Sequence, residues 1–237
     1  MVASEERVVP ESTTDVEQMV QRYRRRGTRW YRYLSPPLPL VHNPAERQLP
    51  DSGTGHVLLI GGAAQATAAH VINLDIVAAP GVDVVADAAA LPFADGQFAR
   101  IECDAVLEHV PNPDVVVAEV RRTLARGGYA HLVVPFNHPY HGYPRDYHRW
   151  TRLGFERLIH PLEVVDAGVR TGPAATWLLT TLQFVKLVVP GASGRLLGAA
   201  VGWVLWPVRY VDLWLYRRDD AHVLANSLYV LARKPDE

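Results

Sequence analysis

Residues 82–135 read VDVVADAAALPFADGQFARIECDAVLEHVPNPDVVVAEVRRTLARGGYAHLVVP, and this stretch decides the fold. It contains three short apolar runs rich in Val and Ile, namely Val82–Ala86, Phe98–Cys103 and Tyr129–Val134. Short runs of this kind predict buried strands. Apolar residues between Asp114 and Leu124 recur at the helical period. The stretch therefore predicts two strands, a helix and a further strand that runs parallel to the second.

The ends of the predicted helix carry recognisable signals. Asn112 can cap its start, Pro113 suits the first turn, and Asp114 meets the positive end of the helix dipole. Gly127 and Gly128 offer a residue able to adopt positive φ, which predicts that the helix ends at this pair. Basic residues near the last turn support this end: Arg121, Arg122 and Arg126.

Composition describes an ordinary globular protein. The 237 residues are 49% apolar with a formal net charge of −1, so one large α/β domain is expected and nothing points to nucleic acid. Cys103 is the only cysteine, which predicts a buried, inert thiol and a reducing cytoplasm. The first 30 residues lack a signal-peptide core, and the longest uncharged apolar run, Leu196–Val208, is too short to span a bilayer.

The N-terminal region combines basic and aromatic residues. A helical pattern over Val16–Tyr33 contains six arginines in eleven residues, interleaved with Tyr and Trp. Such a helix can bind a phosphate, an anionic substrate or an acidic membrane, or simply present a solvated face. The prolines of Ser35–Pro39 then predict a stiff connector.

Two further strands precede the central stretch. His56–Ile60 predicts a buried first strand that ends at Gly61 and Gly62, and His70–Ile76 predicts a second strand with Asp75 near its end. Ligands of open α/β sheets bind outside the carboxyl ends of the strands. A glycine turn there permits close approach, and a carboxylate there can hold ribose hydroxyls.

The order of these motifs resembles a known family. LLIGG, NLDI, VVADAAALPFADGQFARIECDAVLEHV and LARGGYAHLVVP follow one another as in class I S-adenosylmethionine-dependent methyltransferases of the type 11, ubiquinone/menaquinone-methyltransferase-like group. The resemblance covers about residues 55–158 and a last strand near 226–233. It implies a Rossmann-like seven-stranded, mostly parallel sheet with an antiparallel last strand, an N-terminal helix, and a helical insertion before that strand.

The resemblance also implies a cofactor site for S-adenosylmethionine. Two glycines match the family's glycine loop, which lies beside the methionine part of the cofactor. An acidic residue matches the one that binds the ribose. Further pairs match the adenine-contacting segment and the segment that faces the sulfonium end. In chain order the predicted cofactor-binding residues are Gly61, Gly62, Asp75, Ile76, Asp87, Ala88, Asp104 and Ala105.

Two departures from the family pattern bear on activity. Ala63 and Gln65 stand where relatives have further glycines, and only 13 residues separate Gly61 from Asp75, which leaves little room for a crossover helix. A methyltransferase-like protein that has lost or repurposed methyl transfer is therefore an alternative interpretation. Such a protein would bind a ligand, assist a partner or catalyse another reaction.

A histidine-rich loop follows the strand that ends at Pro135. Its residues PFNHPYHGYPRDYHRWT are similar to a substrate-facing segment of type 11 relatives. His138, His141 and Tyr147 are the catalytic candidates, because a histidine of near-neutral pKa can accept a proton from the methyl acceptor. One alternative gives the loop a structural role. Another is a metal site, but the spacing of its ligands fits no standard zinc motif, so no metal is predicted; those ligands would be His138, His141, Asp146 and His148.

An apolar insertion rich in tryptophan occupies about residues 171–225. Its surface must be covered by something. The insertion can form an apolar substrate pocket over the active site, bury itself in a homodimer, or contact a membrane surface. The first two together are favoured.

The sequence thus predicts an N-terminal extension, residues 1–50, and a methyltransferase-like domain, residues 51–237. The expected activity is methyl transfer from S-adenosylmethionine to a small, partly apolar molecule. A peripheral membrane methyltransferase with a lipid-like acceptor is a further alternative.

Overall fold

The computed structural model describes residues 39–42, 55–62, 70–142 and 145–236. The predicted helix over Val16–Tyr33, most of the proline connector, and the departures at Ala63 and Gln65 lie outside the described residues. Whether a short crossover helix follows Gly62 is likewise outside them.

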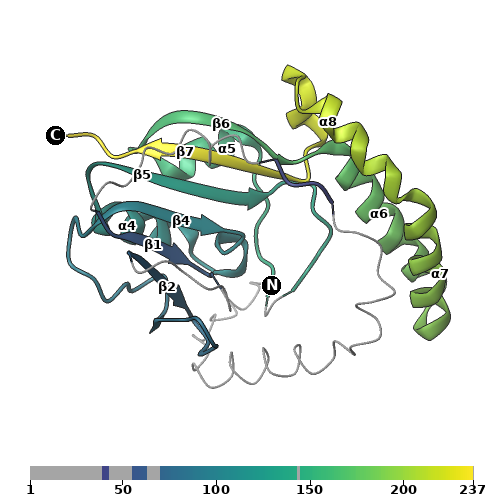
Figure 1. The fold of residues 1–237 in the computed structure, drawn as a ribbon, viewed down its shortest axis with the longest axis horizontal. Coiled ribbons are helices and arrows are strands. Elements are labelled where there is room, and N and C mark those ends of the chain that lie inside the picture. Colours follow the sequence, from purple (N-terminus) through teal and green to yellow (C-terminus); the bar gives the residue numbers. More distant parts are fainter. Residues whose placement is uncertain (1–38, 43–54, 63–69, 143–144, 237) are drawn as a thin grey trace, which may run out of the picture.

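A seven-stranded sheet forms the centre of the protein, in the order β3-β2-β1-β4-β5-β7-β6 (Figure 1). Neighbouring strands pair in parallel from β3 to β5, whereas β7 is antiparallel to both β5 and β6. The predicted sheet, with its antiparallel last strand, is confirmed. The strands are β1 (Val57–Ile60), β2 (Val71–Asp75), β3 (Val84–Val85), β4 (Phe98–Asp104), β5 (Leu124–Pro135), β6 (Glu163–Thr171) and β7 (Ser227–Arg233).

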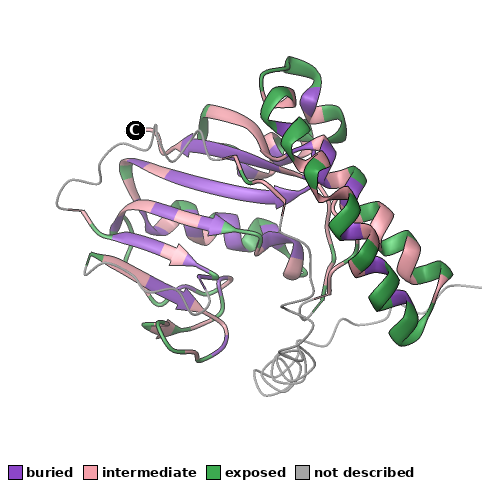
Figure 2. Cartoon of the chain, turned by 45° about the vertical axis from the view of Figure 1, so that its right-hand side comes forward, coloured by how far each residue is buried: buried purple, intermediate pink, exposed green. Residues whose placement is uncertain are grey.

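Helices pack on one face of the sheet and continue beyond its edge. The described helices are η1 (Leu107–His109), α4 (Pro113–Thr123), α5 (Arg152–Ile159), α6 (Pro173–Val188), α7 (Gly191–Leu205), η2 (Trp206–Val211), α8 (Asp212–Leu215) and η3 (Asp219–Leu224). Val116 and Val120 of α4 and Phe155 of α5 are fully buried against alternate residues of β1, β4 and β5. The central strands and these helix faces make the core (Figure 2).

Several local predictions need correction. The helix begins at Pro113 as expected, but the Asn112 side chain makes no capping hydrogen bond. It also ends at Thr123, and the chain becomes extended at Leu124. Gly127 does adopt positive φ, at 69°, but it does so inside β5. The pairing of β5 with β4 and β7 extends the strand backward, so the two glycines lie within it rather than at a helix end.

Two predicted strands also changed length. The third strand is the two-residue β3 rather than Val82–Ala86, because it pairs only with β2, at the edge of the sheet. The sixth strand, which the sequence predicts at Leu162–Val169, runs instead from Glu163 to Thr171, because it pairs with β7 along its whole length. Cys103 is fully buried in β4, as expected, and burial raises the pKa of its thiol.

Helices α6 and α7 form a hairpin that stands beside the carboxyl edge of the sheet (Figure 1). Gly194, Gly198 and Gly202 recur every fourth residue on the buried side of α7, where missing side chains let the two helices approach closely. The base of the hairpin is fixed by Asp212, whose buried carboxylate accepts hydrogen bonds from the N–H groups of Ala174 and Ala175, at 2.8 and 3.1 Å. The first turn of α6 is thereby capped by α8.

Candidate functional site

The parallel strands end at one edge of the sheet, and most predicted site residues lie there. Gly61 follows β1 directly, and its amide donates to the carbonyl of Leu74 at the end of β2, at 2.8 Å. Its φ of 75° and the position of its missing side chain both require glycine, because a Cβ would lie 2.3 Å from Cγ2 of Val106. A Cβ on Gly62 would lie 2.3 Å from Oδ1 of Asn73.

Asp75 and Ile76 lie at the carboxyl end of β2. The Asp75 carboxylate accepts a hydrogen bond from the amide of Val77, at 3.0 Å, which orients the side chain where the strand ends. Both residues are half-buried. The acidic group thus lies one strand away from the Gly61 turn, since β1 and β2 are direct neighbours.

Asp87 and Ala88 come after β3. The exposed Asp87 carboxylate accepts from the amide of Ala89, at 2.8 Å, and closes a local turn. Ala88 is buried. This hydrogen bond shows that Asp87 forms the turn, and the Asp87 side chain stays exposed to solvent.

Asp104 is the last residue of β4, and Ala105 follows it beside the Gly61 turn. Ala105 has φ of 55°, a strained conformation for a residue with a side chain, and Val106 behind it contacts the glycine turn. Asp104 pairs with Arg170 of β6, Oδ2 to Nη2 at 3.0 Å. Sequence reasoning missed Arg170, because 66 residues separate the two partners and no motif marks it.

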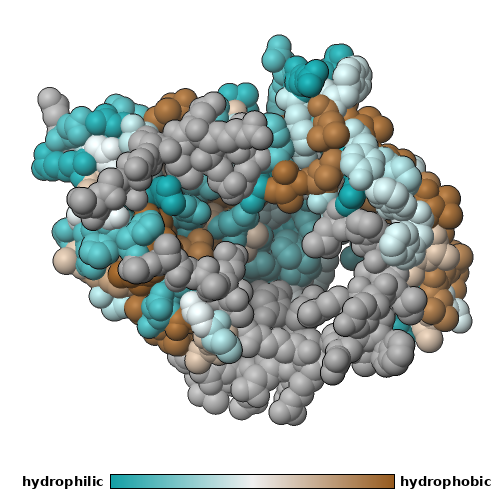
Figure 3. All heavy atoms as spheres, viewed as in Figure 1, coloured by the Kyte–Doolittle hydropathy of each residue, from teal (hydrophilic) through white to brown (hydrophobic). Residues whose placement is uncertain are grey.

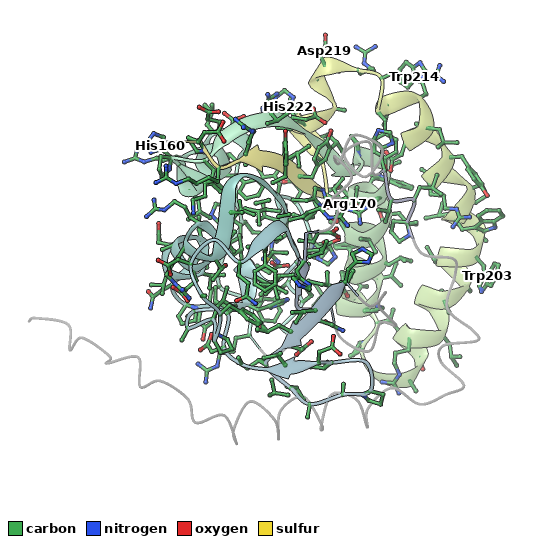
Figure 4. All side chains as sticks on the ribbon, turned by 60° about the vertical axis from the view of Figure 1, so that its left-hand side comes forward. His160, Arg170, Trp203, Trp214, Asp219 and His222 are labelled. Carbon is green, nitrogen blue, oxygen red and sulfur yellow. The ribbon has the colours of Figure 1, made fainter. Side chains whose placement is uncertain are left out.

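Arg170 lies between the sheet and the hairpin (Figure 4). Its side chain is only 14% exposed, and its buried Nε and Nη1 have no hydrogen-bond partner among the described residues. Such a guanidinium presents two further donors beside Asp104, which suits an anionic group.

The histidine loop folds back over the same edge and is tied to η1. The amide of Tyr147 donates to the carbonyl of Glu108, at 2.7 Å, and Nδ1 of His109 contacts the carbonyl of Arg145. The amide of Trp150 donates to the carbonyl of Pro135, which closes the base of the loop at 3.1 Å. The predicted residues His138 and His141 come together, with ring centroids 4.3 Å apart. Tyr147 joins the site through its backbone amide, and the residue is 41% exposed.

Asp146 and Arg149 hold the loop from inside. The Arg149 guanidinium contacts both Asp146 carboxylate oxygens, with Nη2 2.6 Å from Oδ2, and the amide of His141 donates to Oδ2 at 2.9 Å. Burial raises the pKa of the carboxyl group, but hydrogen bonds from Arg149 and His141 outweigh it and lower the pKa of Asp146 to about 2. Asp146 and Arg149 therefore have a structural role, because their contacts hold the loop in shape.

The low pKa of Asp146 predicts a pH-dependent contribution to stability. Because the folded pKa lies below the ordinary value of 3.8, the contribution is present above pH 3.8 and disappears as the pH falls through about 2. Between pH 5 and pH 3 the wild type should lose about 1 kcal/mol more unfolding free energy than Asp146→Asn. Urea unfolding at both pH values measures this. Equal losses in the two proteins would contradict the assignment.

A buried carboxylate and two histidines meet beneath the loop. Glu108 of η1 is fully buried, and its Oε1 lies 3.5 Å from Nε2 of His141 and 3.8 Å from Nε2 of His109. His148, part of the metal set considered from sequence, contacts the carbonyl of Pro111 instead. Sequence analysis assigned neither Glu108 nor His109 to the site, because their nearness to His141 depends on how the loop folds.

Comparison with known proteins bears on the family and the fold of the chain. A family model described as a methyltransferase domain matches residues 50–132, which include β1 to β4, η1, α4 and most of β5. Residues 50–132 thus match a methyltransferase domain, and the sheet around them has the class I methyltransferase fold. The model does not specify the ubiquinone-like subgroup expected from the sequence. A search of curated proteins found no match.

Solved structures show that the methyltransferase fold extends over most of the chain. A candidate methyltransferase in complex with the Haloferax volcanii Trm112 methyltransferase activator is 14% identical, with a TM-score of 0.54, and the match covers 95% of this chain and 99% of that one. A geranyl diphosphate methyltransferase in complex with GPP and sinefungin is 15% identical, with a TM-score of 0.53 and coverage of 92% and 99%. An S-adenosylmethionine-dependent methyltransferase from Mesorhizobium loti is 14% identical, with a TM-score of 0.50 and coverage of 81% and 96%. At these identities the likeness establishes the fold.

Proposed function

We propose that this methyltransferase domain transfers a methyl group from S-adenosylmethionine to a small, partly apolar acceptor. The observation that carries the proposal is the meeting of a glycine turn, two strand-end carboxylates and a histidine loop at one edge of the sheet. The methyltransferase match over residues 50–132 and the cofactor named for the Mesorhizobium loti neighbour support this choice of chemistry.

The residues present suit the cofactor. Gly61 and Gly62 form a turn that a Cβ would disrupt, and the Asp75 carboxylate can accept hydrogen bonds from the ribose hydroxyls. Asp104 can accept from the ammonium of the methionine part, while the free donors of Arg170 can bind its carboxylate. Turn residues Asp87 and Ala88 border the region expected for the adenine.

The histidine loop supplies the group that can accept a proton. A bound cofactor supplies an electrophilic methyl group, so the protein mainly has to position the acceptor and receive its proton. Burial lowers the pKa of His138, which favours the neutral form of its imidazole. Its Nδ1 lies 2.7 Å from the carbonyl of Pro139 and must donate there, which leaves Nε2 with the accepting lone pair. His141 lies beside it as the second candidate.

Cofactor binding tests the proposal directly. Calorimetric titration of the full chain with S-adenosylmethionine and S-adenosylhomocysteine should show one site per chain, with dissociation constants in the micromolar range. Absence of binding up to millimolar concentration would reject methyl transfer. It would favour the alternative of a methyltransferase-like protein with another role.

A second candidate function places the enzyme on a membrane, with a lipid-like acceptor. The hairpin, together with the η2 and α8 turns that continue it, leaves large apolar side chains exposed on its outer side. Trp203 and Trp214 point away from the body there (Figure 4). Hydrophobic surface follows the outer edge of the hairpin, whereas the hollow between hairpin and sheet is largely hydrophilic (Figure 3). The exposed residues are Trp177, Phe184, Leu187, Val188, Leu196, Leu197, Trp203, Val204, Tyr210, Val211, Leu213 and Trp214.

Charge on the hairpin favours an anionic bilayer. Between Pro173 and Arg218 the only acidic residue is Asp212, and it is buried as the cap of α6. The remaining charges are all basic, and Arg209 and Arg218 lie over aromatic rings, as suits a headgroup region. These basic residues are Lys186, Arg195, Arg209, Arg217 and Arg218.

The continuous helical stretch Gly191–Leu215 is, by length and composition alone, also able to cross a membrane, and 17% of its most apolar window is buried. The uncharged run Leu196–Val208, expected to be too short to span a bilayer, is part of this longer helical stretch. We favour contact with the membrane surface, because Asp212 fastens the end of this stretch to α6. Arg195 and Arg209 also interrupt its apolar sequence. The hairpin then brings the carboxyl edge of the sheet close to membrane-embedded acceptors.

A further inference from the structure

We propose that Glu108, His109 and His141 form a binding site for one divalent transition metal ion, with Zn²⁺ as the best-fitting probe. Ligand atoms of these three residues lie within 4.8 Å of one another. The site comes from two separate parts of the chain, η1 and the histidine loop. This proposal departs from the sequence-based expectation that no metal is bound.

The environment of Glu108 first suggests a cation. The side chain is 1% exposed, and neither Oε1 nor Oε2 has a hydrogen-bond partner among the described residues. An isolated carboxylate is costly to bury unless a charge or a metal compensates it. In the same loop, the guanidinium of Arg149 is engaged with Asp146. Among the described residues, the basic groups recorded within 4 Å of Glu108 are the imidazoles of His109 and His141, which carry a charge only if protonated.

The distances around Glu108 suit coordination better than hydrogen bonding. Its Oε1 lies 3.5 Å from Nε2 of His141 and 3.8 Å from Nε2 of His109. Both distances are too long for good hydrogen bonds. A tetrahedral Zn²⁺ with bonds of about 2.0 to 2.1 Å would hold neighbouring ligand atoms roughly 3.4 Å apart. The Glu108–His141 distance is already close to that spacing, and the other separations, all within 4.8 Å, must shorten to reach it.

The outer nitrogens of the two histidines are held as in many metal sites. Nδ1 of His109 contacts the carbonyl of Arg145 and must donate to it, so Nε2 presents its lone pair toward Glu108. Nδ1 of His141 lies 3.4 Å from Oδ2 of Asp146, and equally far from Nη2 of Arg149. A carboxylate or carbonyl behind a ligand histidine fixes the ring and its tautomer.

Two nitrogens and one oxygen would leave at least one coordination position open. Such an arrangement is typical of catalytic rather than structural zinc sites. His138 lies beside His141, so an oxygen bound at the open position would be near a proton acceptor. The metal would then bind the oxygen of the methyl acceptor and lower its pKa. This last role rests on the proposed function, whereas metal binding itself does not.

Calorimetric titration of the chelator-treated full chain with ZnCl₂ tests the site. We expect one equivalent to bind with a dissociation constant below about 1 μM, and Mg²⁺ to bind far more weakly because imidazole is a poor magnesium ligand. Zn²⁺ at 100 times its dissociation constant should raise the Tm by roughly 5 to 10 °C. Glu108→Gln, His109→Asn and His141→Asn should each weaken Zn²⁺ binding at least tenfold.

The matched control is His148→Asn, because His148 is in the same loop but contacts Pro111 outside the cluster. It should retain wild-type zinc affinity. The two partly exposed histidine variants keep the test decisive if Glu108→Gln fails to fold. Zinc binding weaker than about 100 μM, or equal affinity in wild type and both histidine variants, would overturn the proposal. Binding of S-adenosylhomocysteine is measured on the same samples, so failure of the metal site is distinguishable from failure of the methyltransferase assignment.

Discussion

Replacing Asp75 by alanine should weaken S-adenosylmethionine binding about 10- to 100-fold. The Asp75 carboxylate lies at the carboxyl end of β2, one strand away from the Gly61 turn, where ribose hydroxyls can donate to it. Loss of charged hydrogen bonds costs about 1.5 to 3 kcal/mol each, which corresponds to this change in dissociation constant. Calorimetric titration of wild type and variant at one pH and salt concentration gives the ratio.

Two further variants separate cofactor binding from folding. Asp75→Asn keeps an oxygen that can accept from the amide of Val77 but removes the charge, so it should weaken binding less than alanine does. Asp114→Ala removes an exposed carboxylate from the first turn of α4 and should leave cofactor affinity unchanged. If Asp75→Ala folds normally and binds with wild-type affinity, Asp75 does not hold the ribose.

Placing two glutamates on the outer side of the hairpin should reduce binding to anionic vesicles at least 100-fold. Leu196 is 62% exposed and Trp203 is 48% exposed, and the two lie seven residues, or about two turns, apart on the same side of α7. Each would lose roughly 1.5 to 3 kcal/mol of apolar burial, and each added charge is repelled by the lipid headgroups. Co-sedimentation of Leu196→Glu/Trp203→Glu with phosphatidylserine-containing vesicles at low salt measures the effect.

The matched control carries the same change in charge elsewhere. Leu153 on α5 and Val165 on β6 are also exposed and apolar, so Leu153→Glu/Val165→Glu should bind vesicles nearly as well as wild type. If wild-type protein stays in the supernatant, the membrane function is wrong. Analytical ultracentrifugation then tests the alternative, in which a second copy of the chain covers the apolar surface of the hairpin. A dimer that the hairpin glutamates dissociate would show that self-association buries this surface.

The central framework was predicted well, because the strand and helix patterns that define it are local in the sequence. Runs of Val and Ile between Val57 and Val134 became strands, and the helical period before Thr123 became α4. Gly61, Asp75 and Asp104 could be placed at one edge because parallel strands end together. The boundaries were less predictable: Gly127 has the positive φ expected of a helix end but lies in β5, since strand pairing outweighs the local glycine signal.

The hairpin shows a different limit. Its apolar composition predicted helices that must be covered, and the sequence favoured cover by the active site or by a second chain. In the structure the buried face of α7 is its glycine side, whereas the large apolar residues point outward. Which side of a helix is buried follows from the neighbour it packs against, so composition alone did not decide it.

Sequence alone predicted the sheet and the methyltransferase match, because both depend on residues close together in the chain. The positions that it names for the cofactor stay predictions. Only the tertiary structure brought Glu108 and His109 to His141, and Asp104 to Arg170. These contacts join segments about 30 and 66 residues apart, in a loop and at a strand edge. No periodicity or spacing constrains such pairs. They arise from the way the chain returns over the carboxyl edge of the sheet.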